Sequence, residues 1–411
     1  MAWLQSTVFP SEVDNQLLPQ LKHTLKISST AWYQIVVMYE SVANTATLVL
    51  MKSVNGGAEW YKIHTLETSR VDMADTWYDK WTDGGTGTLW HIVWFESSPN
   101  DNVNYIAFDT ADDTLSSMVV VQNGTSVAIS GGCISITKAR GGQLGVAWDL
   151  DGGTELGFAT STTEGSAASF SARLTVWEAT RDYVILMPNP DSADAQDIIG
   201  LYWDFSANEI SRKNFTDAAN TWTETSIATS MNEGTTVDSP QYAATYDHTN
   251  NNILMIAWDA KDTSTADLLF WTIDNASISS PVNVNTNADN CVMAALQIIG
   301  TDIYAFYAGK SDGSQVFSTL FQTGTLGIYY KVSSDSGATW GSEQTLLTPN
   351  QTNGSVAGLT CDLINDAPVV TFRTGTYTGA GSLGLQRVAY PEPAVGSGML
   401  VHPGMTGRLS G

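Results

Sequence analysis

Residues 253–259 read Ile-Leu-Met-Ile-Ala-Trp-Asp, a short apolar run that ends in an aromatic residue followed by an acidic turn residue. The pattern recurs along the chain, at residues 35–40, 92–96, 144–149, 199–204 and 303–307, and more loosely at 369–373. These copies lie about 50 to 65 residues apart, which marks the chain as a repeat. Each run is too short and too rich in β-branched residues for a helix, so each predicts a β-strand.

Further strand-like segments accompany the recurring run within each repeat. A segment of small residues precedes it, as at 133–137, and a third strand follows it, as at 47–51. A fourth segment often comes next, as at 118–121. Four strands per repeat at this period are typical of a β-propeller. The sequence therefore predicts an all-β protein with four-stranded antiparallel blades, seven by this count and six if one repeat is misread.

The last repeat has only three strand-like segments and ends near Val388. Residues 3–9 at the N-terminus could supply the missing fourth strand and close the ring, which would remove exposed sheet edges. The prediction is a single propeller domain over residues 1–395, followed by a Gly-rich tail over residues 396–411.

The charge of the chain limits its partners. With 42 acidic and 18 basic residues, the formal net charge is −24, so binding to nucleic acid or to anionic lipid is disfavoured. The chain has no run of 18 apolar residues, which argues against insertion into a membrane. Its first residues do not read as a signal peptide. Cys133, Cys291 and Cys361 have neither disulfide nor zinc spacing, so we expect buried free thiols.

A specific motif stands at residues 333–340, which read S-S-D-S-G-A-T-W. Its spacing is that of a hairpin turn, in which a carboxylate accepts backbone N–H groups and glycine supplies the positive φ. The tryptophan can then fold back into the groove between sheets. The residues that carry this pattern are Ser333, Asp335, Gly337, Thr339 and Trp340.

This motif resembles the Asp box of sialidase-like propellers. Two degenerate copies keep the same register, one with Asn55, Gly57 and Trp60, the other with Asp217 and Trp222. In the family the box is a structural element and not the active site. The resemblance therefore implies a propeller whose hairpins are held by these turns.

Sialidases of this family use three arginines, the first in an Arg-Ile-Pro motif near the N-terminus. Here the first arginine is Arg70, and no Arg-Ile-Pro motif is present. The sequence thus does not favour sialidase activity, and it offers no catalytic residues.

Two weaker candidates concern ligands. Trp77, Tyr78 and Trp81 lie among acidic residues and could hold a sugar ring, or they could pack under their loop or against a neighbouring subunit. Oxygen ligands on a turn, from Asp149, Asp151 and Glu155, could hold Ca²⁺, although a tight hairpin explains them more simply. No other cofactor or metal is indicated.

Propellers host many functions, so the fold leaves the role open. The missing signal peptide, the thiols and the Asn/Thr/Ser/Gly-rich composition favour a structural protein of a bacteriophage virion, in a tail or fibre assembly. Such a protein would be located in the virion and would dock other virion proteins, as a homo-oligomer or ring, or recognise a host glycan. The alternative is a sialidase-like glycoside hydrolase or a carbohydrate-binding propeller.

Overall fold

The computed structural model describes residues 3–7, 22–40, 45–98, 101–123, 133–149, 155–178, 183–204, 207–229, 231, 242–260, 266–285, 291–310, 326–347, 355–361, 364–365, 368–375 and 384–391. Strands make up most of this part of the chain, and its helical segments are single 3₁₀ turns. Within it, no helix is long and apolar enough to cross a membrane.

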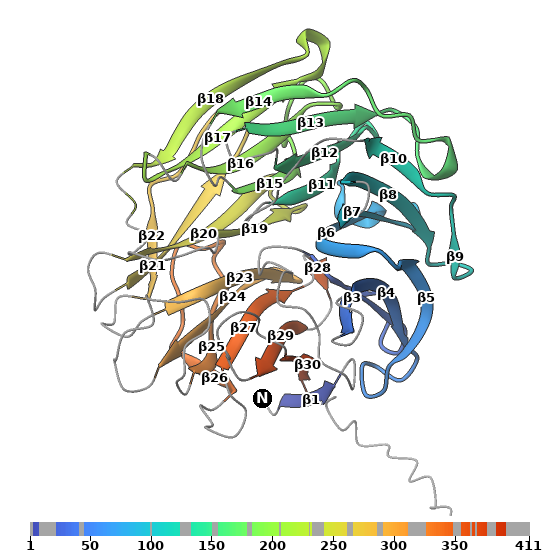
Figure 1. Cartoon of the computed structure of the whole chain (residues 1–411). Helices are drawn as coiled ribbons and strands as arrows, with labels where there is room; N and C mark the ends of the chain where they lie inside the picture. The colour runs from blue at the N-terminus through green and yellow to red at the C-terminus, as the bar shows by residue number, and fades with distance from the viewer. Residues whose placement is uncertain are drawn as a thin grey trace, which may run out of the picture.

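The described strands form seven sheets, five with four strands and two with five, arranged around a common centre (Figure 1). The first sheet contains β2 (Thr24–Lys26), β3 (Trp32–Glu40), β4 (Thr45–Ser53) and β5 (Tyr61–Glu67). The second contains β6 (Arg70–Tyr78), β7 (Leu89–Ser98), β8 (Asn102–Asp109), β9 (Thr114–Leu115) and β10 (Val119–Gln122). The third contains β11 (Ile134–Lys138), β12 (Leu144–Asp149), β13 (Glu155–Ser161) and β14 (Leu174–Glu178).

The next sheets repeat this order along the chain. The fourth contains β15 (Tyr183–Pro188), β16 (Ile198–Asp204), β17 (Glu209–Thr216) and β18 (Thr221–Ala228). The fifth contains β19 (Tyr242–Asp247), β20 (Asn252–Ala260), β21 (Ala266–Ile273) and β22 (Val282–Asn285). The sixth contains β23 (Cys291–Ile299), β24 (Asp302–Lys310), β25 (Leu326–Ser333) and β26 (Gln344–Leu347), with β28 (Ile364–Asn365) parallel to β23.

The seventh sheet closes the ring. It contains β27 (Ser355–Cys361), β29 (Val370–Gly375), β30 (Gly384–Pro391) and β1 (Trp3–Thr7). Strand β1 pairs antiparallel with β30, from Trp3 opposite Pro391 to Thr7 opposite Arg387 (Figure 1). The predicted β-propeller with antiparallel blades, closed by the N-terminal strand, is confirmed, and the seven sheets lie within the predicted range of six or seven blades. The tail 396–411 lies outside the described residues.

The recurring apolar runs are the second strands of the sheets, and their aromatic residues fill the spaces between sheets. Six tryptophans are completely buried, at positions Trp77, Trp90, Trp94, Trp148, Trp203 and Trp271. Burial of such large apolar side chains is the main stabilising contribution in a fold of this kind. Cys133 is buried and forms no disulfide, as expected, and the side chains of Cys291 and Cys361 lie outside the described residues.

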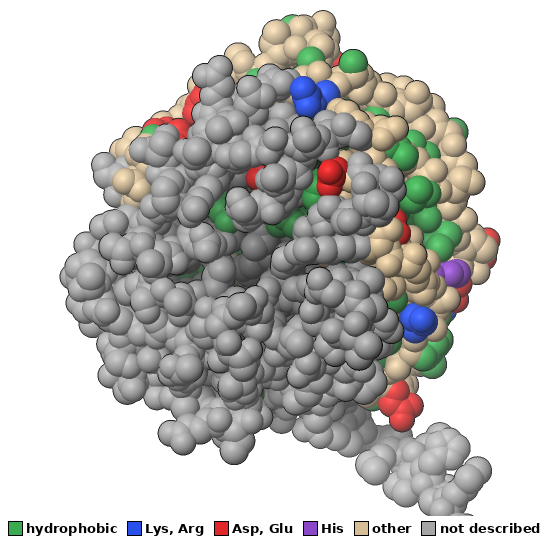
Figure 2. Space-filling view, viewed as in Figure 1, with side chains coloured by type: hydrophobic (Ala, Val, Ile, Leu, Met, Phe, Trp, Pro, Cys, Tyr) green, Lys and Arg blue, Asp and Glu red, His purple; other side chains and the backbone are tan. Residues whose placement is uncertain are grey.

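First strands of consecutive sheets, from β6 through β11, β15, β19 and β23 to β27, contact one another along the inner ring. Side chains connect their edges, because an inner edge leaves backbone N–H groups without a partner in its own sheet. Asp75 Oδ2 on β6 accepts the Ile136 N–H at 2.9 Å, and Ser135 Oγ on β11 accepts the Leu186 N–H at 3.0 Å. Figure 2 shows scattered hydrophobic side chains among polar ones on the described part of the surface. Among the described residues, Tyr61 on β5 and Val120 on β10 are exposed.

Candidate functional site

The predicted turn at residues 333–340 has the expected hydrogen bonds. The Ser333 hydroxyl donates to Asp335 Oδ1 at 2.7 Å and accepts the Gly337 N–H at 2.8 Å, while Asp335 Oδ1 also accepts the Thr339 N–H at 2.8 Å. Gly337 has φ +89°, and a Cβ there would lie 2.1 Å from Phe270 of the neighbouring sheet. The Trp340 ring meets Phe270 edge-on at 5.3 Å. This turn therefore packs one sheet against the next.

The copy at residues 53–60 uses the same bonds. Ser53 donates to Asn55 Oδ1 at 3.0 Å and accepts the Gly57 N–H at 2.9 Å, and Asn55 Oδ1 accepts the Glu59 N–H at 2.9 Å. Trp60 Nε1 donates to the Gly57 carbonyl at 2.9 Å. Both turns fix hairpin geometry within their own sheets.

The third copy forms a different turn. Asp217–Ala219 is a 3₁₀ turn (η4) that ends at Asn220, whose φ is +52°. Trp222 still packs between sheets, with its ring centroid 4.9 Å from that of Phe158. This copy therefore shares the position of its tryptophan with the other two copies but not the hydrogen bonds of their turns. Ala219 stands where the other two copies have glycine.

The aromatic residues suggested for sugar binding form part of the core. Trp77, Tyr78 and Trp81 are all buried, and the Trp77 and Trp81 rings meet edge-on at 5.9 Å. Their faces are not presented to a ligand, which corrects the sugar-stacking interpretation in favour of packing under the loop. For the calcium candidate, Asp149 is buried, while Asp151 and the side chain of Glu155 lie outside the described residues.

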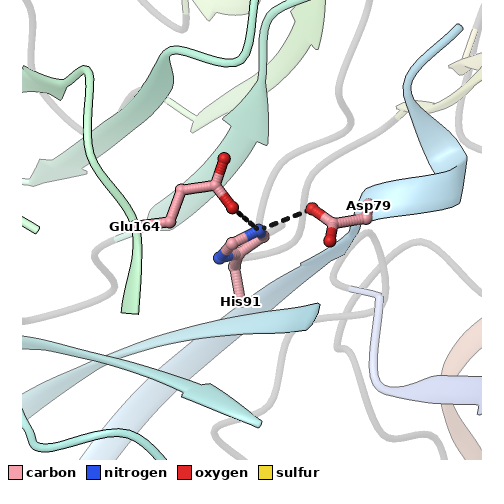
Figure 3. A group of neighbouring side chains, drawn as sticks. All are labelled: Asp79, His91 and Glu164. Atoms are coloured by element: carbon pink, nitrogen blue, oxygen red, sulfur yellow. Dashed lines mark hydrogen bonds and ion pairs between the residues drawn. The ribbon is translucent and has the colours of Figure 1, made fainter. Parts of the chain in front are cut away.

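A different group of polar side chains gathers between the second and third sheets (Figure 3). Asp79 follows β6 and begins the 3₁₀ turn η1 (Asp79–Trp81), and His91 lies near the start of β7. Glu164 precedes the 3₁₀ turn η3 (Gly165–Ala167), and Lys138 ends β11. Asp79 and Lys138 thus lie at equivalent places, at or just after the end of the first strand of two consecutive sheets.

These side chains are closely paired. His91 Nε2 lies 3.0 Å from Asp79 Oδ1 and 3.7 Å from Glu164 Oε2 (Figure 3). Lys138 Nζ bridges the two carboxylates, at 2.6 Å from Asp79 Oδ1 and 2.7 Å from Glu164 Oε1. Asp79 Oδ2 accepts the Leu89 N–H at 3.0 Å. Asp79 therefore has a hydrogen bond at each of its oxygens.

Burial and ion pairing shift the pKa values of these groups in opposite directions. Burial alone would raise the pKa of Asp79, but the hydrogen bonds and charges of His91 and Lys138 outweigh it and lower the pKa to about 2. Burial would likewise lower the pKa of Lys138, and Asp79 and Glu164 reverse this and raise it. At neutral pH the centre of the group is an ionised Asp79–Lys138 pair.

Tyr105 on β8 fixes the orientation of His91. Its hydroxyl oxygen lies 2.8 Å from His91 Nδ1 and accepts the Gly165 N–H at 3.1 Å. The phenolic proton is therefore directed to Nδ1, so a neutral His91 carries its proton on Nε2 and donates it to Asp79. Burial raises the pKa of Tyr105, which keeps the phenol protonated. Both ring nitrogens of His91 are thus occupied by protein groups.

The group opens into a cavity of about 360 Å³. Its walls are the glycine-rich loops at residues 82–87 and 139–142, together with Asp79, Lys138 and Glu164. A Cβ on Gly87 would lie 2.0 Å from Asp79 Oδ2, so this loop can approach the carboxylate only as glycine. The cavity is a polar recess with backbone, carboxylate and ammonium groups on its walls.

Oxygen and nitrogen atoms of Asp79, His91 and Glu164 come within 4.8 Å of one another, as a metal site requires. However, the Lys138 ammonium already lies within hydrogen-bonding distance of both carboxylates. A metal cation would meet this positive charge at two of its three ligands. The donor set therefore does not fit a metal ion, and Lys138 takes the role of the counter-ion.

The sequence interpretation did not select any of these residues. The histidines are scattered singly along the chain, so His91 carried no pattern. The available signal was positional, since the glycine-rich loops 84–87 and 141–142 each follow the first strand of consecutive repeats. Loops at equivalent positions of neighbouring blades lie side by side.

Comparison with known proteins gives no match to any family model and none among curated proteins. Among solved structures, the chain is similar to a polysaccharide lyase described as PL25 ulvan lyase, with TM-score 0.57 and 10% identity over 93% of this chain and 96% of the other. The same lyase bound to -[GlcA(1-4)Rha3S]- gives TM-score 0.58 at 10% identity over the same shares. A weaker similarity is to the Aleuria aurantia lectin, with TM-score 0.44 and 12% identity over 84% and 100%.

At these identities the similarity shows the β-propeller fold alone. By its description, the lyase acts on a polysaccharide, which is a statement about the lyase. The absence of a matching family model leaves the Asp-box resemblance without support from a family assignment.

Proposed function

We propose that this protein is a carbohydrate-binding β-propeller, and that the cavity beside Asp79, Lys138 and Glu164 binds the saccharide. The observation that carries the proposal is this polar cavity of about 360 Å³, into which a paired group of ionisable side chains opens. Binding pockets combine a preformed recess with a few fixed polar groups. Carboxylate oxygens, an ammonium group and exposed backbone of glycine loops suit the many hydroxyl groups of a sugar.

Binding fits this geometry better than cleavage does. Glycoside hydrolysis needs one carboxylic acid that donates a proton and a second carboxylate that acts as base or nucleophile. With a pKa of about 2, Asp79 stays ionised, and both its oxygens are already hydrogen bonded. His91 has no free nitrogen to serve as base, because Tyr105 and Asp79 occupy both. Asp79 and His91 therefore provide neither a carboxylic acid nor a free imidazole nitrogen for proton transfer at the cavity.

A glycan array followed by titration calorimetry tests the proposal. The wild-type chain is expected to bind one class of saccharide, and Glu164→Gln is expected to weaken that binding about tenfold or more, because it replaces the carboxylate that pairs with Lys138 at the cavity wall by a neutral amide. The matched control is Glu224→Gln on β18, an exposed partner of Lys213 that is remote in sequence from the cavity. Release of reducing ends should stay at background.

If Glu164→Gln leaves saccharide binding unchanged, or if Glu224→Gln weakens it to the same extent, the cavity is not the binding site. Turnover of the bound saccharide would replace the binding function by an enzymatic one. The virion role, with its virion location and virion partners, stays a prediction from the sequence, as does the expected homo-oligomer.

A further inference from the structure

The cavity wall carries acidic and basic side chains whose charges are unequally compensated. Its acids are Asp79, Asp83 and Glu164, and its bases are Lys138 and Arg140. Lys138 is held by Asp79 and Glu164 at 2.6 and 2.7 Å. Arg140 Nε donates to the Asn189 carbonyl at 3.0 Å and its Nη2 to the Ser192 carbonyl, so the guanidinium is fixed against the fourth sheet.

Asp83 is the carboxylate that remains for a ligand. Its side chain is 51% exposed, and its partner among the described residues is His248, whose Nδ1 lies 3.8 Å from Asp83 Oδ1. Burial lowers the pKa of His248 even though Asp83 opposes this, so the imidazole is largely neutral at pH 7. Among the described residues, Asp83 forms no ion pair with a lysine or arginine, so it presents a negative charge at the cavity wall, where Arg140 is the other charged group without an ion pair.

The surroundings of Asp83 reinforce this negative potential. Burial raises the pKa of the nearby Tyr246 phenol, and the charges of Asp83, Asp191 and Asp247 raise it further, although the charge of Arg140 lowers it. On the scale of the whole chain, 42 acidic residues oppose 18 basic ones. The cavity wall carries three acids and two bases, and the acidic excess of the whole chain adds to this, so the net charge favours a cationic ligand over an anionic one.

We infer that the saccharide bound in this cavity carries free ammonium groups, as a 2-amino-2-deoxy sugar does, and that Asp83 receives one of them. The inference rests on the proposed saccharide site and names its ligand class. Uronate and sulfate sugars, such as the ligand named for the lyase of similar fold, are expected to bind more weakly. An ammonium at the cavity wall would form a charge-assisted hydrogen bond with Asp83, while the rest of the sugar contacts the glycine loops.

The experiment compares three oligosaccharides of equal length by titration calorimetry at low salt, namely a glucosamine oligomer, its N-acetylated form and an oligogalacturonate. The glucosamine oligomer is expected to bind about three- to tenfold more tightly than the N-acetylated form, a typical range for a partly exposed ion pair. The oligogalacturonate should bind weakest. Asp83→Asn should bring the first two ligands to equal affinity, while Asp302→Asn at the start of β24 keeps the preference.

The outcomes separate the two proposals. If none of these sugars and no array glycan binds, the saccharide site itself is wrong. If the sugars bind but the N-acetylated or uronate form binds as well as the amine, or if Asp83→Asn keeps the preference, the ammonium inference is wrong and the saccharide site stands.

Discussion

Two aspartates four residues apart, Asp75 within β6 and Asp79 just after it, each pair with a lysine and contact the third sheet. Asp75 is completely buried and bonds to Lys22 Nζ at 3.0 Å, Ser135 Oγ at 3.1 Å and the Ile136 N–H at 2.9 Å. Asp79 is also buried, but its partners Lys138 and Glu164 open into the cavity. The same pairing chemistry therefore gives a sealed connection at the inner ring and an accessible site where the strand ends.

The sealed pair should show the largest effect on stability. Asp75→Ala would leave the Lys22 ammonium buried without its counter-charge, and burial already lowers the pKa of Lys22 in the presence of Asp75. We expect a loss of about 3–5 kcal/mol in the free energy of unfolding, measured by urea denaturation at pH 7. A loss below about 1 kcal/mol would show that the pair does not hold the inner ring together.

The open pair should give a pH-dependent contribution. The pKa of Asp79 is lowered from 3.8 to about 2, so its stabilising contribution is complete above pH 3.8 and is lost as the pH falls toward 2. This amounts to about 2 kcal/mol. Between pH 5 and pH 2, wild type should lose about that much more stability than Asp79→Asn. Parallel pH profiles for the two proteins would contradict the shift.

The glycine loop should link stability to binding. Gly87→Ala places a Cβ 2.0 Å from Asp79 Oδ2, so the carboxylate or the loop must move. We expect a loss of about 1–3 kcal/mol in unfolding free energy and weaker saccharide binding. Gly84→Ala in the same loop is the control. A Cβ there would have no atom within 4 Å, so the only destabilising effect expected is the backbone strain of an alanine at φ +73°. If the two substitutions change saccharide binding equally, the position of Asp79 does not contribute to the binding site.

The smallest effect concerns the orientation of His91. Tyr105→Phe removes the hydroxyl between His91 Nδ1 and the Gly165 N–H. We expect a loss of about 1–2 kcal/mol in unfolding free energy. Nitrogen chemical shifts should report the Nε2–H tautomer of His91 in wild type and a mixture in the variant. An Nδ1–H tautomer in wild type would reverse the assigned hydrogen bonds.

Much of the fold was predictable because the same strand pattern occurs several times in a repeat sequence. The run at residues 253–259 became the second strand β20, and the N-terminal strand closes the seventh sheet at Trp3–Thr7 as expected. Period-two strands and turn residues are local properties, so they can be recognised within one segment. Even the turn at Asp335 follows from residues that are neighbours in sequence.

The site was not predictable, because its residues come from three separate turns and two strands. Asp79 and Glu164 lie 85 positions apart and meet only when the second and third sheets pack. Trp77 and Trp81 misled the sequence interpretation for a related reason, since aromatic residues among acids suggest an exposed loop until the burial of each ring is known. Burial and side-chain convergence are tertiary properties that a single sequence does not display.

The central claim is that the cavity beside Asp79, Lys138 and Glu164 binds a saccharide. A crystal structure of the protein with the tightest-binding array glycan tests this most directly. The account predicts sugar density between loops 82–87 and 139–142, with a hydroxyl or ammonium group within hydrogen-bonding distance of Asp83 or Glu164. Sugar density elsewhere on the propeller, with this cavity holding only water, would contradict it.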